Sequence, residues 1–412
     1  MTAIPKIAFI SRNSFDFKLY SRIAKSFENS FIVVIKDVSM HLAALFDDIG
    51  FIDDVNYIVL PPNELPTVDK QADIVMFITP FPGIEKFEAA KLVSLQYGLA
   101  KEDHNYGAWR ALADMNLMYG DYSTSQVETF APSYSVGSVQ YAGWDVEADK
   151  EKRRQIQANL QLPPDRPNIL FMPTWGKVGS FADLVGPLGK LTERCNIIVK
   201  MHHNNELKGL DWKEQAWAVG IRHLHSGGSN IRELLSVADL VVSDFSGAIF
   251  DAVYAQVPVL MYHARVDEIE GEQKFSKDSL EYRRRDELGL VCEERSSFAG
   301  CVARALDSSE QLVRDAAAIR EELFGTGIQA CSLQNIENKL MSLYNGEIPS
   351  LTRAQLRIRR VYKELLTLKA TKTGKTANTV RKTGGAAAPS QPSSGFGEGV
   401  FARLFRKEAG KK

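Results

Sequence analysis

The stretch Ala238–Tyr262, ADLVVSDFSGAIFDAVYAQVPVLMY, carries the pattern that decides the fold. A short apolar run, Leu240–Val242, leads directly into a polar turn, Ser243–Gly247, and a helical pattern and a second apolar run follow. This order is typical of a parallel β-sheet, and it places the polar turn at the carboxyl end of a strand. Free amide groups at the start of the following helix favour a bound phosphate, although a side chain of the turn could instead simply cap the helix.

The same alternation of short apolar runs and longer helical patterns, such as Asp16–Asn29, extends over the first 345 residues. The apolar runs are rich in β-branched residues and bounded by polar residues, as buried strands are. The expected strands are Lys6–Ile10, Phe31–Ile35, Tyr57–Leu60 and Ile74–Ile78, then Ile169–Met172, Asn196–Met201, Ile221–Leu224, Leu240–Val242, Val259–Tyr262 and Leu290–Cys292. Two successive sets predict an α/β fold with two Rossmann-like, doubly wound parallel-sheet domains facing a cleft.

The domain boundary is expected between Asp145 and Arg166. A charged helical stretch, Glu147–Gln161, is followed there by the segment LPPDRP, residues 162–167, whose prolines cannot continue a helix. We therefore expect an N-terminal domain of residues 1–150, a C-terminal domain of residues 151–345, a basic helix over residues 346–370 and a flexible basic tail over residues 371–412.

The C-terminal segment differs from the body in charge. From Leu351 onward there are 15 Lys and Arg against 3 Asp and Glu, whereas the whole chain has a net charge of -1. The tail ends in Phe401, Leu404 and Phe405 among basic residues, which predicts a reversible anchor on an anionic membrane surface, with a merely solvated tail as the alternative. No nucleic-acid partner is expected, because the body is acidic. Four widely spaced cysteines and the lack of a long apolar run favour a cytoplasmic protein.

Two further polar segments follow predicted strands. Lys200 and His202 alternate at the end of one strand and so point to one side, where a cation and an imidazole suit a phosphoryl group. Pro173 and Thr174 follow another strand, and the Thr hydroxyl and backbone could contact a ligand. The histidines near these strands lack the spacing of a zinc site, so no metal is expected.

Together these segments resemble the CDP-glycerol glycerophosphotransferase family of teichoic-acid and capsule polymerases, which has the GT-B fold. The family has a Pro-Thr segment, a Lys/Arg-x-His-Pro motif and a Ser/Thr-Asp-Tyr/Phe-Ser-Ser…Asp motif followed by an apolar strand. The corresponding segments here are Pro173–Thr174, Lys200–His203, Ser243–Asp251 and Val257–Tyr262. His203 replaces the proline of the second motif.

The resemblance implies a role for each matched residue. The donor pyrophosphate would lie on the turn that contains Ser243, Asp244, Ser246 and Gly247, near Lys200, Pro173 and Thr174. His202 would assist the departure of CMP, and Asp251 would orient the site or a ribose.

The N-terminal domain of the family supplies a His-Gly motif, whose histidine acts as the base on the acceptor hydroxyl. Here the segment Leu95–Gly98 has Tyr97 at that position. A tyrosine with its ordinary pKa of about 10 is a poor base unless a nearby cation lowers that pKa. His104, seven residues later, is the alternative base.

The resemblance implies an enzyme without a cofactor. It would transfer glycerol phosphate, or a related alditol phosphate, from a CDP-linked donor to a hydroxyl of a cell-surface polymer or lipid-linked acceptor, and release CMP. A sugar transferase that uses a nucleotide sugar and an epimerase of the same fold remain alternatives, because the fold does not determine the chemistry. Tyr97 leaves a third alternative open, a non-catalytic donor-binding subunit.

Overall fold

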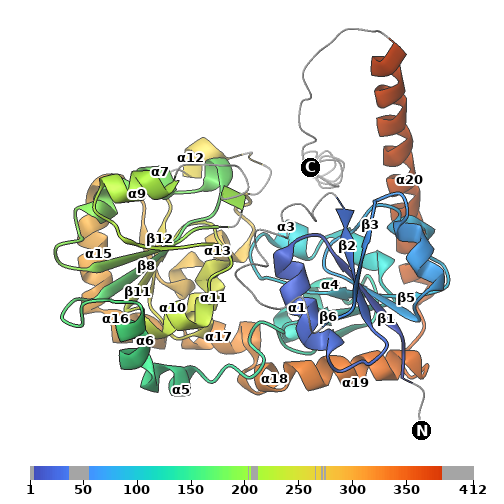
Figure 1. Ribbon diagram of the computed structural model, residues 1–412, viewed down its shortest axis with the longest axis horizontal. Coiled ribbons are helices and arrows are strands. Elements are labelled where there is room, and N and C mark those ends of the chain that lie inside the picture. Colours follow the sequence, from blue (N-terminus) through green and yellow to red (C-terminus); the bar gives the residue numbers. More distant parts are fainter. Residues whose placement is uncertain are drawn as a thin grey trace, which may run out of the picture.

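The computed structural model describes residues 4–36, 55–202, 204–205, 212–264, 266–270, 272 and 275–382. Over these residues the chain forms two parallel β-sheets, each with a hydrophobic core on both faces. The two sheets belong to separate lobes that lie side by side (Figure 1). The expected α/β fold of two Rossmann-like, doubly wound domains is confirmed.

The first sheet has seven strands in the order β3-β2-β1-β4-β5-β6-β7, and all neighbours are parallel. The strands are β1 (Ile7–Ser11), β2 (Phe31–Ile35), β3 (Tyr57–Leu60), β4 (Ile74–Phe77), β5 (Lys91–Leu95), β6 (Met115–Met118) and β7 (Ser133–Ser135). Helices α1 (Ser14–Ala24) and α19 (Ser332–Tyr344) pack on one face, and α20 (Arg353–Lys382) packs on the other. Burial on both faces explains why the central strands are continuous apolar runs.

The second sheet has six parallel strands in the order β10-β9-β8-β11-β12-β13. The strands are β8 (Asn168–Met172), β9 (Asn196–Lys200), β10 (His223–His225), β11 (Leu240–Ser243), β12 (Val259–Tyr262) and β13 (Leu290–Cys292). One face packs against α10 (Ile231–Val237), α11 (Ala248–Tyr254) and α17 (Ala317–Phe324), and the other against α7 (Phe181–Gly189), α9 (Trp212–Ala218) and α15 (Phe298–Asp307).

Shorter helices complete both domains. The α-helices are α3 (Glu102–Asn105), α4 (Asp121–Val127), α5 (Val146–Glu151), α6 (Arg153–Asn159), α12 (Val266–Ile269), α13 (Leu280–Arg283), α14 (Arg285–Leu288), α16 (Ser309–Asp315) and α18 (Thr326–Ala330). The 3-10 helices are η2 (Leu65–Lys70), η3 (Ile84–Lys86), η4 (Ala108–Leu112), η5 (Gly176–Val178) and η6 (Arg295–Ser297).

The predicted strands agree with the structure except in one region. All six strands of the second sheet are predicted to within two residues, and so are β1 to β4. Strands β5, β6 and β7 are missing from the prediction, because their sequences contain Lys, Ser, Asn and Met in place of β-branched runs. Helix α1 ends at Ala24 rather than at the expected Asn29.

The chain crosses between the domains twice. It leaves the first domain after β7 and enters the second through α5 and α6, and it returns through α17 and α18 (Figure 1). Gln329, on the return segment, is fully buried: it accepts a hydrogen bond from the Ser138 amide at 2.7 Å and donates one to the Tyr119 carbonyl at 2.8 Å. Gly137, just after β7, has a φ of +87°, and a Cβ there would lie 2.8 Å from the carbonyl oxygen of Ile328 in α18. The segment after β7 and the return segment are therefore in close contact.

The end of the chain differs from the expected division. Residues 332–344, assigned above to the C-terminal domain, form α19 and pack into the core of the first sheet through Ile336, Leu340 and Leu343. The basic helix begins at Arg353, and it continues to Lys382 rather than ending at residue 370, so the expected flexible tail does not begin at 371. Residues 383–412, with Phe401, Leu404 and Phe405, lie outside the described residues, as does His203.

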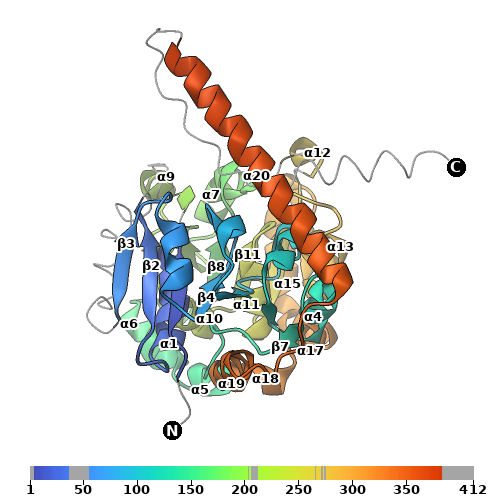
Figure 2. The same ribbon diagram turned by 90° about the vertical axis from the view of Figure 1, so that its right-hand side faces the viewer.

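Helix α20 packs against the first domain with its N-terminal half and then projects beyond the body of the molecule (Figure 2). Arg359 pairs with Asp114 at 3.0 Å, and Lys363 donates to the Phe87 carbonyl at 3.0 Å, which fixes the helix on η4 and its surroundings. No helix in the described ranges is long and apolar enough to cross a membrane.

Candidate functional site at the domain interface

The polar turn after β11 lies at the point where the winding of the second sheet reverses. Strands β8 and β11 are neighbours at the centre of this sheet, and the chain leaves them in opposite directions. Ligands of doubly wound folds bind beside such a reversal, at the carboxyl ends of the strands. The Pro173–Thr174 segment follows β8 and the Ser243–Gly247 turn follows β11, so the structure brings these two predicted segments together.

Asp244 holds the two segments in place. Its carboxylate accepts hydrogen bonds from the Thr174 amide at 2.9 Å, the Ser180 amide at 2.9 Å and the Ser180 hydroxyl at 2.8 Å. Burial raises the pKa of Asp244 to about 6, while these hydrogen bonds and the nearby Lys101 cation oppose the rise. Asp244 is only 1% exposed, so its role differs from the direct donor contact expected from the sequence: it shapes the loop after β8.

The other side chains of the turn also serve the fold. The Ser243 hydroxyl donates to the Met172 carbonyl at 2.6 Å, and the Ser246 hydroxyl accepts from the Ala248 amide at 3.3 Å. The N-cap residue of α11 is Gly247, so the helix is not capped by a side chain of Ser243 or Asp244. Gly247 is exposed, and neither its amide nor that of Ser246 donates to another described residue. Backbone amides, rather than hydroxyls or carboxylates, are what this turn offers to an anion.

Pro173 and Thr174 are both buried. The Thr174 hydroxyl has no hydrogen-bond partner among the described residues, although the residue is only 1% exposed. An unpaired buried hydroxyl is uncommon in a folded protein and calls for a specific explanation. Here it lies in the loop that Asp244 holds.

Lys200 and His202 lie at the end of β9, next to β8. The Lys200 ammonium donates to the Gly227 carbonyl at 2.9 Å. The His202 ring lies 6.2 Å from the ring of Trp175, between centroids, and its Nδ1 accepts from the Asn204 amide at 3.2 Å. A neutral ring that accepts at Nδ1 carries its proton on Nε2, so His202 can donate a hydrogen bond from Nε2.

Asp251, one turn into α11, connects the two domains. Its Oδ1 accepts hydrogen bonds from the side-chain Nε2 of Gln140 and from the Tyr141 hydroxyl, each at 2.7 Å. Burial raises the pKa of Asp251 to about 6, against the opposing effects of Tyr141 and of the Lys200 cation. Asp251 is thus held by residues of the other domain. Both of its expected roles, orienting the site and contacting a ribose, remain predictions.

Tyr97 and His104 come together on the opposite domain. Their ring centroids lie 6.3 Å apart in an edge-on arrangement, and Phe15 packs edge-on against the other side of Tyr97 at 6.3 Å. Arg110, which the sequence analysis did not select, is buried behind them. Burial lowers the pKa of Arg110 to about 9, whereas Tyr97 and two further tyrosines favour its charged form.

A second group that the sequence analysis missed joins the domains beside the turn. The Lys101 amide donates to Glu281 Oε1 at 2.9 Å, and the Glu102 amide donates to the Ser279 hydroxyl at 3.1 Å. Helices α3 and α13 lie between the two sheets at this place (Figure 1). Glu281 is 180 residues from Lys101 in sequence, and no local pattern indicates the pair.

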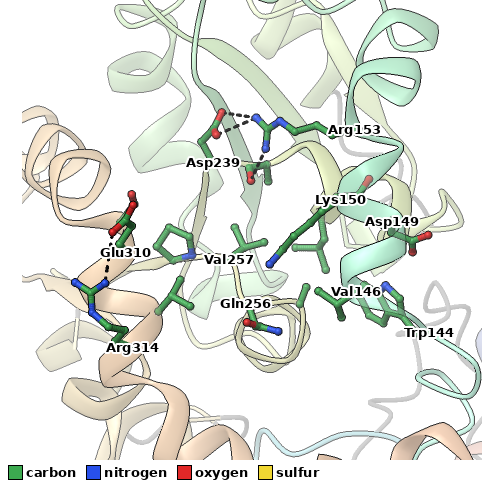
Figure 3. Close-up of a pocket in the computed structure, with 17 residues that line it drawn as sticks. Trp144, Val146, Asp149, Lys150, Arg153, Asp239, Gln256, Val257, Glu310 and Arg314 are labelled. Atoms are coloured by element: carbon green, nitrogen blue, oxygen red, sulfur yellow. Dashed lines mark hydrogen bonds and ion pairs between the residues drawn. The ribbon is translucent and has the colours of Figure 1, made fainter.

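A cavity of about 470 Å³ lies elsewhere, at the opposite end of the second sheet. Its lining includes Asp239 and Pro258, which precede β11 and β12, and the linker residues Trp144 and Lys150. Figure 3 shows the ion pairs at its rim, Arg153 with Asp239 and Arg314 with Glu310. None of the motif residues lines this cavity. The candidate site is instead at the carboxyl ends of the strands, where hydrogen-bond donors have no partner among the described residues.

Comparisons with known proteins show which family this chain resembles. Residues 145–325 match the model of a family described as CDP-Glycerol:Poly(glycerophosphate) glycerophosphotransferase. The family resemblance is confirmed. All of the C-terminal motif residues lie in the glycerophosphotransferase match, whereas Tyr97, His104 and Lys101 lie outside it.

One curated relative is the teichoic acid poly(glycerol phosphate) polymerase of Bacillus spizizenii. The two sequences are 27% identical over an alignment of 142 residues. This alignment covers 32% of this chain and 33% of the relative, so the chain spans about a third of the relative's length. Among solved structures, wall teichoic acid polymerase TagF soaked with CDPG gives a TM-score of 0.59 at 15% identity, over 83% of this chain and 89% of that chain. Another TagF structure gives 0.58 at 14% identity, over the same shares. At this identity the likeness shows the fold.

His263, directly after β12, gives the glycerophosphotransferase-like domain a pH dependence. Its ring stacks on Phe245 at 4.3 Å between centroids, and neither ring nitrogen has a hydrogen-bond partner among the described residues. Burial, together with the nearby Arg285 cation, lowers the pKa of His263 to about 3. An unfolded histidine has a pKa of about 6.5, so between these values the unfolded chain binds a proton that the folded chain excludes.

We therefore expect the free energy of unfolding to fall as the pH drops below about 6.5, with His263 contributing about 2 kcal/mol of the loss by pH 5. His263→Phe keeps the stacking and removes both unpaired nitrogens. Denaturant unfolding of the parent and the variant at pH 8 and pH 5 should show a loss smaller by about that amount in the variant. Equal losses in both proteins would contradict the assignment.

Proposed function

We propose that this chain transfers glycerol phosphate, or a related alditol phosphate, from a CDP-linked donor to a hydroxyl of a cell-surface polymer or lipid-linked acceptor, with release of CMP. The acceptor oxygen attacks the β-phosphorus of the donor and forms a new P–O bond. The bond from that phosphorus to the bridging oxygen breaks, and CMP leaves with the electron pair. The acceptor proton passes to a base.

The observation that carries this proposal is the set of unpaired hydrogen-bond donors at one switch point. The amides of Ser246 and Gly247 and the hydroxyl of Thr174 have no partner among the described residues. Asp244 binds the Thr174 amide and so holds the two segments together. Fixed donors around one point stabilise a phosphoryl group whose charge changes during reaction.

His202 is assigned to the leaving group. Its Nδ1 accepts from the Asn204 amide, so the ring carries its proton on Nε2 and would donate it to the CMP phosphate as negative charge develops there. Lys200, fixed by the Gly227 carbonyl, adds a positive charge at the same edge of the sheet. These two residues accelerate the reaction by positioning and charge stabilisation, which need no metal ion.

The acceptor base is assigned to the Tyr97–His104 pair. The two rings lie next to each other, and the charge of the buried Arg110 interacts with Tyr97. Either ring would receive the acceptor proton. In this proposal the acceptor and donor residues come from different domains and meet at their interface.

We expect His202→Ala to reduce CMP release from CDP-glycerol by at least about a hundredfold, because the leaving group loses its proton donor. In the same assay, His104→Ala should be severe and Tyr97→Phe mild if His104 is the base. The reverse order would assign the base to Tyr97. Thermal unfolding of each variant checks that the fold survives.

His223→Ala, on β10 of the same sheet, serves as the matched control, since His223 lies outside the proposed machinery and should keep the parental rate. A near-parental rate of CMP release by His202→Ala would contradict the assignment of His202 to the leaving group.

The replacement of the family histidine by Tyr97 also favours a second candidate function, a donor-binding subunit without catalysis. The non-catalytic function is supported if the parent protein binds CDP-glycerol reversibly but releases no CMP.

We also propose that the chain works on the cytoplasmic face of a membrane, held there by its basic C-terminal segment. Helix α20 contains ten Lys and Arg and one acidic residue, Glu364. Leu356, Val361 and Leu368 are 48%, 57% and 61% exposed on it, so apolar and basic groups lie on the same helix. Anionic lipid attracts such a segment with about 1 kcal/mol per basic residue near the surface.

The full chain should therefore sediment with phosphatidylglycerol vesicles at low salt and release from them as salt rises. A chain truncated after Ala370 should bind less, and Val361→Ser with Leu368→Ser in the full chain should weaken binding further. Vesicles of neutral phosphatidylcholine are the control. Equal binding of the full and truncated chains to anionic vesicles would exclude a role for the residues after 370.

A further inference from the structure

Lys101 holds a cation beside the donor turn, and it comes from the other domain. It follows Ala100, and a Cβ added at Gly247 would lie 3.9 Å from the Ala100 Cβ, so the two segments are neighbours. The charges that interact with the Lys101 ammonium are those of Glu281 and Asp244, and Asp244 is the residue that shapes the turn. Lys101 thus reaches the switch point of the second domain from the first.

The Lys101 ammonium has no hydrogen-bond partner among the described residues. The backbone amide of Lys101 donates to Glu281. Burial lowers the pKa of Lys101, and the two nearby carboxylates oppose that effect. Because Lys101 is partly exposed, a ligand at the interface can reach its ammonium and supply acceptors for its three N–H donors.

The backbone at Lys101 is held in an uncommon conformation. Its φ is 60°, in the left-handed region, which a residue with a Cβ seldom adopts. On one side, Glu281 accepts from the Lys101 amide. On the other, Glu102 accepts from the Tyr122 hydroxyl at 2.5 Å and pairs with Arg283 at 3.2 Å. The surrounding contacts therefore fix where this side chain begins.

We propose that Lys101 binds the phosphates of the CDP-linked donor across the domain interface, together with the free amides of Ser246 and Gly247 and the hydroxyl of Thr174. This inference rests on the proposed function, and it adds a donor contact from the domain that supplies the acceptor base. Donor binding then joins the two domains. The acceptor base is consequently brought into position by the donor itself.

The left-handed backbone at Lys101 allows a test that separates binding from folding. Lys101→Gly removes the cation but suits a positive φ, so the fold should be as stable as the parent or more stable. Gln161→Gly is the matched control, because Gln161 has a φ of 57° and lies in the linker after α6, away from the turn. Lys101→Gln and Lys101→Arg test the charge at nearly constant length.

Calorimetric titration of the full chain with CDP should show an affinity lower by about ten- to a hundredfold in Lys101→Gly and Lys101→Gln, the effect of losing a hydrogen bond to a charged group. Lys101→Arg should stay within a few-fold of the parent, and Gln161→Gly should equal it. If Lys101→Gly binds CDP as the parent does, the inference is wrong while the proposed function stands. If the parent binds neither CDP nor CDP-glycerol, the proposed function is wrong and this inference with it.

Discussion

The buried carboxylate of Asp244 is the constraint on which the rest of the proposed donor site depends. It ties the turn after β11 to the loop after β8 through hydrogen bonds from Thr174 and Ser180. Removing a carboxylate from water is costly unless such donors surround it. Because the side chains of Asp244, Ser243 and Ser246 are all used within the protein, the backbone amides of the turn are left for a ligand.

The first domain has a similar arrangement at its own reversal point, between β1 and β4. Asp16 is buried there and accepts from the Arg12 amide at 3.0 Å, and the Arg12 side chain reaches the Thr79 hydroxyl at 3.2 Å after β4. Each sheet thus has a buried carboxylate next to the strands where its winding reverses. Asp251, Gln329 and Glu281 make contacts between the domains. These contacts hold the two reversal points opposite each other.

The sequence predicts those parts of the protein that are local. The turn Ser243–Gly247 and the strands around it follow from one contiguous stretch, because burial on both faces of a parallel sheet demands continuous apolar runs. The positions of Lys200, His202 and Thr174 at strand ends follow from the same argument. Strands β5 to β7 are not predicted by this argument, because they are not continuous apolar runs. Ser94 of β5 and Asn116 of β6 are buried polar residues that form a hydrogen bond with each other inside the sheet.

Long-range contacts account for the other differences. Lys101 and Glu281 are 180 residues apart, so nothing near either residue indicates that they meet. Asp244 binds Ser180 and Thr174, which are 64 and 70 residues away in sequence. Its local sequence alone therefore suggests only a helix cap or a ligand contact. The amphipathic pattern of residues 332–344 predicts a helix face to be buried, but not that the first sheet, rather than the second, covers it.

The central claim is that the donor binds between the two domains at the carboxyl ends of the strands. Hydrogen exchange of the full chain with and without CDP-glycerol tests it most directly. We expect slower exchange in three separate segments: Thr174–Ser180, Ser243–Ile249 and, from the other domain, Leu99–Asn105. Protection confined to Trp144–Arg153 and Ser309–Arg314, around the cavity at the opposite end of the second sheet, would contradict the account, as would protection of the second domain alone.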